Sequence, residues 1–100
     1  MFVVIRSLSV AAGQEPAARQ WAIDVADYLN QKFPGHNIRA YREWFGTNGR
    51  IYWTGENTSL ADVEQSWRDW ESDPGYINMV TQAQGFFVAG SLRDVVIEQL

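Results

Sequence analysis

The stretch His36–Glu56, HNIRAYREWFGTNGRIYWTGE, decides the fold of this chain. Its two halves alternate in side-chain character on either side of the turn-forming cluster 46–49, and the Asn48-Gly49 pair in that cluster is a strong hairpin signal. Aromatic and β-branched residues on both sides favour strands. We therefore predict two antiparallel strands, 36–45 and 50–56, joined by a tight turn.

The residues before this hairpin predict a strand followed by a helix. Residues 2–10 carry apolar side chains on both faces, which is typical of a strand in the middle of a sheet. Residues 16–33 carry apolar side chains at helical spacing. Pro16 suits the first helical position, and Pro34-Gly35 ends the helix.

The residues after the hairpin predict a broken helix and a last strand. Ser59 is a good N-cap for a helix whose apolar positions include Trp67 and Trp70. Asp73-Pro74-Gly75 interrupts that helix, because proline cannot donate a hydrogen bond to the preceding turn. A second helical piece is expected to run to about Gln84, and residues 92–100 form the final strand.

The resulting order, βαββαβ, is that of a ferredoxin-like α+β fold covering residues 1–100 as one domain. Both helices should lie on one face of a four-stranded antiparallel sheet. The other face would carry apolar side chains, and such a face predicts a partner, most simply a second copy of the chain. The candidates for that face are Tyr41 or Trp44, Tyr52 or Trp53, and Val95 or Val96.

Two segments carry a resemblance to a known superfamily. The helix broken at Asp73-Pro74-Gly75-Tyr76 and the connector Gly85–Asp94, GFFVAGSLRD, resemble the dimeric α+β-barrel superfamily. That group includes antibiotic-biosynthesis-monooxygenase-like and NIPSNAP-like domains. The resemblance implies a homodimer formed through the sheet faces and a ligand cleft between sheet and helices. It leaves the activity open, because the group includes several kinds of enzyme and proteins of no known activity.

Composition excludes several classes of function. The net charge is −4, and the charged residues are interspersed, which argues against nucleic acid as a partner. The chain has no cysteine, so disulfides and thiol catalysis are excluded. Haem-degrading members of the superfamily use a histidine on the second helix, and this sequence has none there. We expect no metal and no cofactor.

The sequence predicts no membrane association. The apolar run at the N-terminus is interrupted by Arg6, and no stretch approaches the ~20 apolar residues that a membrane span needs. A cytoplasmic location fits this pattern and the lack of cysteine.

Tryptophan is unusually frequent, with five residues in 100. These side chains either fill the core or line a cleft for a flat apolar ligand. The two interpretations differ in volume, because a cleft requires an opening of roughly 300 Å³ or more. The candidate ligand-binding residues are Arg42 at the rim, with Arg6 as a further polar anchor, and Tyr28, Trp44, Trp53 and Trp67.

Two functions remain open, and no catalytic residue is assigned. The first is a binding or structural homodimer with an aromatic-lined cleft for a small apolar ligand. The alternative is a cofactor-independent, monooxygenase-like enzyme acting on a flat aromatic or polyketide-like substrate. The excess of tryptophan favours the alternative, whereas the lack of an acid–base constellation favours the first. The only histidine, His36, follows Pro34-Gly35 in a predicted exposed turn, so we expect it to be dispensable.

Overall fold

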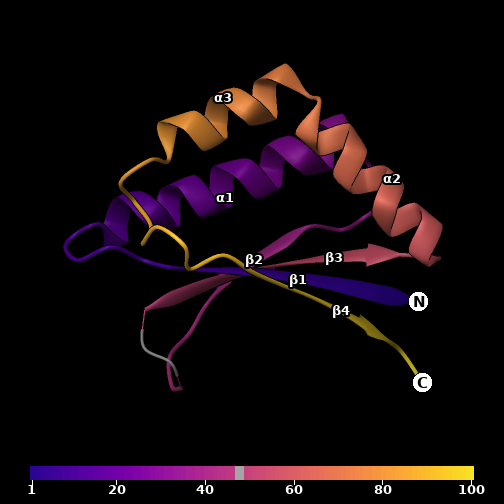
Figure 1. The fold of residues 1–100 in the computed structure, drawn as a ribbon, viewed down its shortest axis with the longest axis horizontal. Helices are drawn as coiled ribbons and strands as arrows, with labels where there is room; N and C mark the ends of the chain where they lie inside the picture. Colours follow the sequence, from indigo (N-terminus) through magenta and orange to yellow (C-terminus); the bar gives the residue numbers. More distant parts are fainter. Residues whose placement is uncertain (47–48) are drawn as a thin grey trace.

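The computed structural model describes residues 1–46 and 49–100, which form a four-stranded sheet with all helices on one face (Figure 1). The sheet order is β2-β3-β1-β4, and every pair of neighbours is antiparallel. This confirms the predicted ferredoxin-like α+β fold. The elements are β1 (Phe2–Ser9), α1 (Glu15–Lys32), β2 (Arg39–Arg42), β3 (Arg50–Asn57), α2 (Leu60–Glu71), α3 (Pro74–Gln82) and β4 (Arg93–Glu98).

The strand register decides which side chains face the helices. Arg6 on β1 lies opposite Trp53 on β3 and Asp94 on β4, and all three point toward the helices. Since side chains alternate along a strand, Val4 and Leu8 share that face. β3 shows the alternation most clearly, because every second residue from Ile51 to Asn57 is buried.

The core lies mainly between α1 and the strands β2 and β3. α1 contributes small and medium-sized side chains, and Ala18 and Ala22 are almost fully buried against the sheet side. Small residues let a helix lie close to its neighbours. α3 differs, since none of residues 74–82 is fully buried. That helix therefore rests over the sheet without closing the space beneath it.

The predicted helix break is confirmed. α2 ends at Glu71, and Asp73 has an extended backbone with φ −81° and ψ 118°. The Asp73 carboxylate accepts a hydrogen bond from the Tyr76 N–H at 2.9 Å, which caps α3. Pro74 takes the first helical position, where a missing N–H costs nothing.

The strand predicted over 36–45 is shorter than expected, because β2 spans only Arg39–Arg42. Asn37 has a φ of +49°, which interrupts extended backbone before β2. The Asn30 side chain then binds both backbone polar groups of Ile38, at 2.8 and 2.9 Å. Beyond β2, Trp44 and Phe45 are 74% and 95% exposed. The predicted turn residues Thr47 and Asn48 lie outside the described part of the chain.

The sheet face away from the helices is called the outer face. Tyr41 pairs with Tyr52 across β2 and β3, and Val95 pairs with Ile5 across β4 and β1. These pairings put Tyr41, Tyr52 and Val95 on the outer face, and Trp53 and Val96 on the helix face.

Candidate functional site

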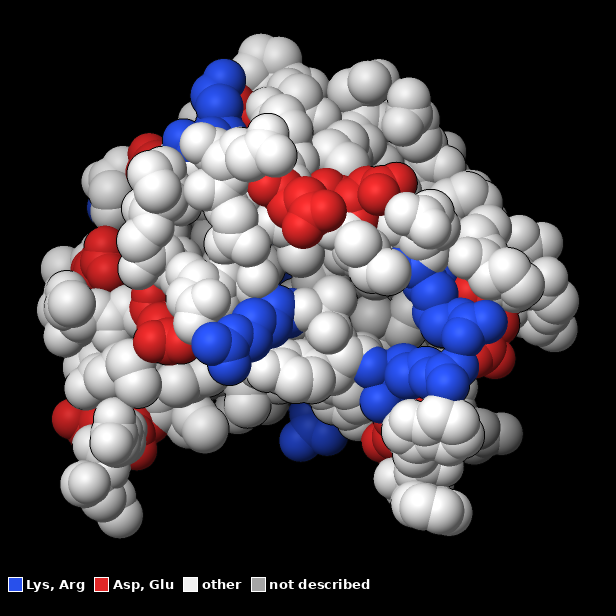
Figure 2. All heavy atoms as spheres, turned by 180° about the vertical axis from the view of Figure 1, so that it is seen from behind, with Lys and Arg blue, Asp and Glu red and all other residues white. Residues whose placement is uncertain are grey.

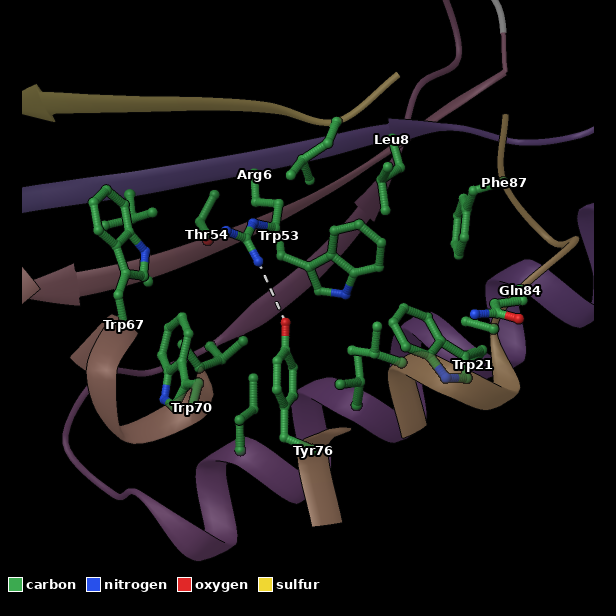
Figure 3. Close-up of a pocket in the computed structure, with 18 of the residues that line it drawn as sticks. Arg6, Leu8, Trp21, Trp53, Thr54, Trp67, Trp70, Tyr76, Gln84 and Phe87 are labelled. Atoms are coloured by element: carbon green, nitrogen blue, oxygen red, sulfur yellow. Dashed lines mark hydrogen bonds between the residues drawn. The ribbon is translucent and has the colours of Figure 1, made fainter. Parts of the chain in front are cut away.

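A cavity of about 530 Å³ lies between the helix face of the sheet and the helices. It exceeds the volume that the cleft interpretation requires. All three helices, β1, β3 and the connector before β4 contribute to its wall (Figure 3). The aromatic and polar residues that line it are Arg6, Trp21, Trp53, Thr54, Trp67, Trp70, Tyr76, Gln84 and Phe87.

One end of the cavity is an aromatic cluster. Trp21 meets Trp53 and Phe87 edge-on, with ring centroids 5.9 and 5.6 Å apart. The Trp21 indole N–H donates to the Met79 carbonyl at 2.8 Å, and the Trp53 indole N–H donates to the Ala22 carbonyl at 3.2 Å. These bonds hold the rings in place and consume their only donors. This end therefore offers a ligand apolar surface.

Trp67 and Trp70 of α2 lie at the opposite end of the cavity (Figure 3). Trp70 is only 8% exposed. Within residues 1–46 and 49–100, neither indole N–H has a hydrogen-bond partner. Both rings present apolar surface, as at the other end of the cavity, but here the indole N–H groups are unpaired among the described residues.

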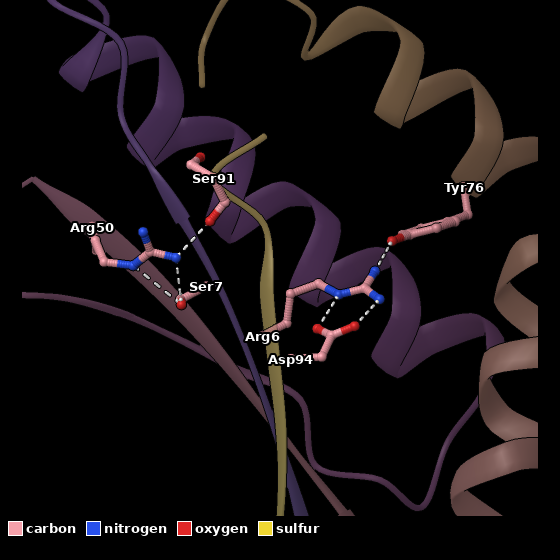
Figure 4. A network of polar contacts seen from close by, with 6 residues as sticks. All are labelled: Arg6, Ser7, Arg50, Tyr76, Ser91 and Asp94. Atoms are coloured by element: carbon pink, nitrogen blue, oxygen red, sulfur yellow. Dashed lines mark hydrogen bonds and ion pairs between the residues drawn. The ribbon is translucent and has the colours of Figure 1, made fainter. Parts of the chain in front are cut away.

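The polar centre of the cavity is Arg6. Its guanidinium binds Asp94 in a bidentate manner, with Nε–Oδ1 and Nη2–Oδ2 distances of 2.8 Å each. Nη1 donates to the Tyr76 hydroxyl oxygen at 3.3 Å (Figure 4). The hydrogen bond to Asp94 is the largest influence that raises the pKa of Arg6, so Arg6 stays charged. Asp94 neutralises that charge locally.

Tyr76 is held in place by the break between α2 and α3. The Tyr28 hydroxyl of α1 donates to Asp73 at 2.6 Å, and Lys32 Nζ lies 3.4 Å from the same carboxylate. The bond from Tyr28, then the Tyr76 N–H and Lys32, lower the pKa of Asp73. Gly75 leaves room for this contact, because an added Cβ would lie 2.1 Å from the Tyr28 oxygen.

The structure brings together three of the six candidate residues, Arg6, Trp53 and Trp67, in the cavity wall. Arg42 and Trp44 do not line it, which corrects the expected rim. Arg42 stacks on the Trp44 ring at 4.2 Å and lies 3.9 Å from Glu15. The reason is position, because β2 is the edge strand and ends at Arg42, on the far side of β3 from Arg6.

Tyr28 is also outside the cavity wall, and its hydroxyl is occupied by Asp73. Tyr76, Trp70 and Phe87 were not among the candidate residues, although the cavity requires them. The sequence pattern indicated Arg6, because this residue interrupts the apolar face of 2–10. It indicated Tyr76 more weakly, as the first aromatic residue after the helix break.

His36 is not in an exposed turn, contrary to expectation. Its Nδ1 lies 3.0 Å from the Glu56 carbonyl, and its ring packs edge-on against Trp70 with centroids 6.3 Å apart. The short β2 explains the difference, because the chain before it folds back along β3 and stays bonded there through Glu56 N–H and the His36 carbonyl at 2.7 Å.

A second arginine, Arg50, organises the outer face. Its guanidinium donates to the Ser7 hydroxyl and to the Ser91 carbonyl, at 2.7–3.2 Å (Figure 4), and to the Ser9 hydroxyl at 2.8 Å. Ser7 is buried beneath it. Elsewhere on the surface, positive and negative side chains are interspersed on the side shown in Figure 2, without one continuous charged area.

The described part of the chain holds no group of three or more histidine and acidic side chains suited to a metal ion. No described helix combines the length and apolar character needed to cross a bilayer.

The fold defines the class of protein, a ferredoxin-like α+β domain, and comparison with known proteins supports that fold. No protein-family model matches the sequence, and no curated protein matches it. Solved structures do match. An uncharacterised NIPSNAP domain protein from Burkholderia xenovorans aligns with a TM-score of 0.82 at 13% identity, covering 100% of this chain and 95% of that one.

Two further solved structures show the same architecture. A NIPSNAP family protein of unknown function from Agrobacterium tumefaciens has a TM-score of 0.79 at 16% identity, covering 97% of this chain and 86% of that one. A proposed antibiotic biosynthesis monooxygenase from Deinococcus radiodurans has a TM-score of 0.74 at 15% identity, covering 99% and 92%. The predicted resemblance is thus confirmed as a likeness of fold, which leaves the function to be argued from the site.

Proposed function

We propose that this protein is a small binding module that holds a flat, largely apolar molecule between its sheet and helices. The observation that carries the proposal is the cavity of about 530 Å³, which falls within the usual range for small-molecule sites. Its wall is aromatic and aliphatic with a few polar groups, which is the usual composition of such sites. Trp53 and Trp67 would contact the ligand directly.

The binding interpretation is favoured over catalysis by the ionisable groups present. Among the described lining residues, only Arg6 and Tyr76 have ionisable side chains. Arg6 is already paired with Asp94 and cannot serve as a general base. A general acid–base reaction needs a group that titrates near the working pH, and the wall offers neither histidine nor carboxylate.

The alternative is a cofactor-independent, monooxygenase-like enzyme. It is supported by the shared fold with the proposed monooxygenase from Deinococcus radiodurans. It predicts oxygen consumption when a flat phenolic or polyketide-like compound occupies the cavity. Oxygen uptake that Tyr76→Phe abolishes would favour this alternative, whereas binding without uptake favours the module.

We also propose that a second copy covers the outer face. Tyr41 and Ile97 are 47% and 48% exposed there, and Ile5 and Val95 lie between them. Exposed apolar side chains of this kind favour association, and a two-fold axis is the simplest arrangement. The helix face is unaffected by such a contact, so the cavity would remain accessible in each protomer.

The binding proposal is tested by narrowing the mouth of the cavity. Val80 of α3 lines the cavity and is partly exposed, whereas Ile77 is similarly exposed on the same helix and does not line it. Val80→Phe should weaken binding of 2-ethylnaphthalene by about fivefold or more, because overpacking costs roughly 1 kcal/mol or more. Isothermal titration calorimetry measures the change.

Ile77→Phe is the matched control and should leave the affinity unchanged. Equal effects of the two variants would place the probe on the helix surface rather than in the cavity. Absence of any binding to the unmodified protein would remove the proposal altogether.

A further inference from the structure

The bond between Arg6 and Tyr76 crosses the cavity. Arg6 is the middle one of the three helix-facing β1 residues that line the cavity, between Val4 and Leu8, and Tyr76 reaches it from α3. Figure 3 shows the two side chains meeting between the Trp67 and Trp70 end and the Trp21 and Phe87 end. A ligand that fills the cavity must therefore lie against this bridge.

The contact between Arg6 and Tyr76, called the bridge, has unused hydrogen-bond donors but no uncompensated charge. Arg6 uses Nε and one N–H of Nη2 on Asp94 and one N–H of Nη1 on Tyr76. Because a guanidinium has five N–H groups, two remain, one on Nη2 and one on Nη1, and the one on Nη1 is next to the Tyr76 hydroxyl. That hydroxyl accepts from Arg6 and, within the described residues, donates to no other group. Two adjacent donors are thus free.

The charges of Arg6 and Asp94 decide which kind of ligand the two free donors can bind. Asp94 already compensates Arg6 through a bidentate contact. A ligand carboxylate would bring an uncompensated negative charge next to Asp94 in an apolar surrounding, and such a charge is costly to bury. A neutral carbonyl oxygen can accept from both donors without that cost.

We propose that the cavity selects an uncharged, flat, largely apolar molecule with a ketone- or quinone-type oxygen bound at the Arg6–Tyr76 bridge, and that it discriminates against carboxylates of similar size. This inference rests on the proposed function, and it adds the chemical class of the ligand. The aromatic ends supply affinity, while the bridge supplies orientation and charge selectivity.

Three probes of similar size separate the effects of apolar contact, of a hydrogen-bond acceptor and of a negative charge on the affinity. They are 2-ethylnaphthalene, which has no acceptor, 2-acetonaphthone, which has a ketone oxygen, and 2-naphthoate, which is an anion. In calorimetric titrations the ketone should bind at least about tenfold more tightly than the hydrocarbon, because it accepts from two donors and one of them is a charged guanidinium. The carboxylate should bind at least tenfold more weakly than the ketone.

Tyr76→Phe should weaken binding of the ketone by about threefold or more, because one of its two donors is lost, while leaving the affinity of the hydrocarbon unchanged. Tyr41→Phe, on the outer face, is the control and should change neither affinity. Asp94→Asn leaves Arg6 without its counter-charge and should reverse the charge preference, with 2-naphthoate gaining about tenfold. Circular dichroism of each variant checks that it is folded.

Hydrocarbon and ketone binding equally well, with no effect of Tyr76→Phe, would overturn this inference and leave the binding function intact. Tightest binding of 2-naphthoate by the unmodified protein would also overturn it, since Arg6 would then act as an anion site. Failure of all three probes would instead count against the proposed function itself.

Discussion

Asp73 is the residue on which the geometry of the α2–α3 break depends. It caps α3 and accepts the hydrogen bond from Tyr28. These contacts lower its pKa in the folded state below the ordinary value of 3.8. A lowered pKa contributes stability that is fully present above the unfolded value and is lost as the pH falls through the folded value.

Asp73→Asn should therefore destabilise the protein at pH 7 and less so in acid. Asparagine still caps a helix, so the difference reports the charge rather than the cap. Urea unfolding of both proteins between pH 7 and pH 2 measures the difference between their free energies of unfolding. This difference should be constant down to about pH 4 and shrink below it. A difference independent of pH would contradict the assigned role of the carboxylate.

His36 should matter for stability, contrary to what the sequence predicts. Its ring packs on Trp70, and Nδ1 binds the Glu56 carbonyl. His36→Ala should lower the free energy of unfolding by about 1–2 kcal/mol, from one hydrogen bond and one aromatic contact. Chemical denaturation measures it, and a loss below about 0.5 kcal/mol would restore the sequence-based expectation.

The α3 element depends on the close approach of α1 at Gly75. Glycine inside a helix normally costs up to about 1 kcal/mol relative to alanine. Here an alanine Cβ would collide with Tyr28, so Gly75→Ala should destabilise by about 1–3 kcal/mol rather than stabilise. The double variant Tyr28→Ala, Gly75→Ala should lose less than the sum of the single effects. Stabilisation by Gly75→Ala would show that the two helices are farther apart.

Elements were predictable from the sequence where periodicity and capping agreed. The alternation around Trp53, the Ser59 cap and the proline at 74 each predicted what the structure contains. β2 was overpredicted, because alternation continues through residues whose backbone is bound by the Asn30 side chain instead of a strand. Local pattern does not reveal such a tertiary contact.

The site was less predictable than the fold. The tryptophan excess directed attention to Trp53 and Trp67, which the structure places in the wall of one cavity. The pairing of Arg6 with Asp94, 88 positions apart, depends on strand order and register. Arg42 has the same alternation as Arg6, but it belongs to an edge strand, so residue pattern alone could not distinguish the two.

We predict that two copies of the chain form a dimer through the outer face. Sedimentation equilibrium at micromolar concentration should give about twice 11.4 kDa. Val95→Glu should shift the protein to monomer, because it buries a charge in the apolar contact. Ile23→Glu, on exposed α1, is the control and should not. A monomer before any substitution would contradict the proposed assembly.

The proposed function requires that a flat apolar molecule can occupy the cavity. The most direct measurement is a titration of ¹⁵N-labelled protein with 2-acetonaphthone, following the five indole N–H signals, each assigned by a single Trp→Phe variant. Trp53 and Trp67 should shift along one saturation curve, while Trp44, which is exposed at the far edge of the sheet, should stay unchanged. A shift of the Trp44 signal alone, or no saturable shift of the Trp53 and Trp67 signals, would contradict binding in the cavity.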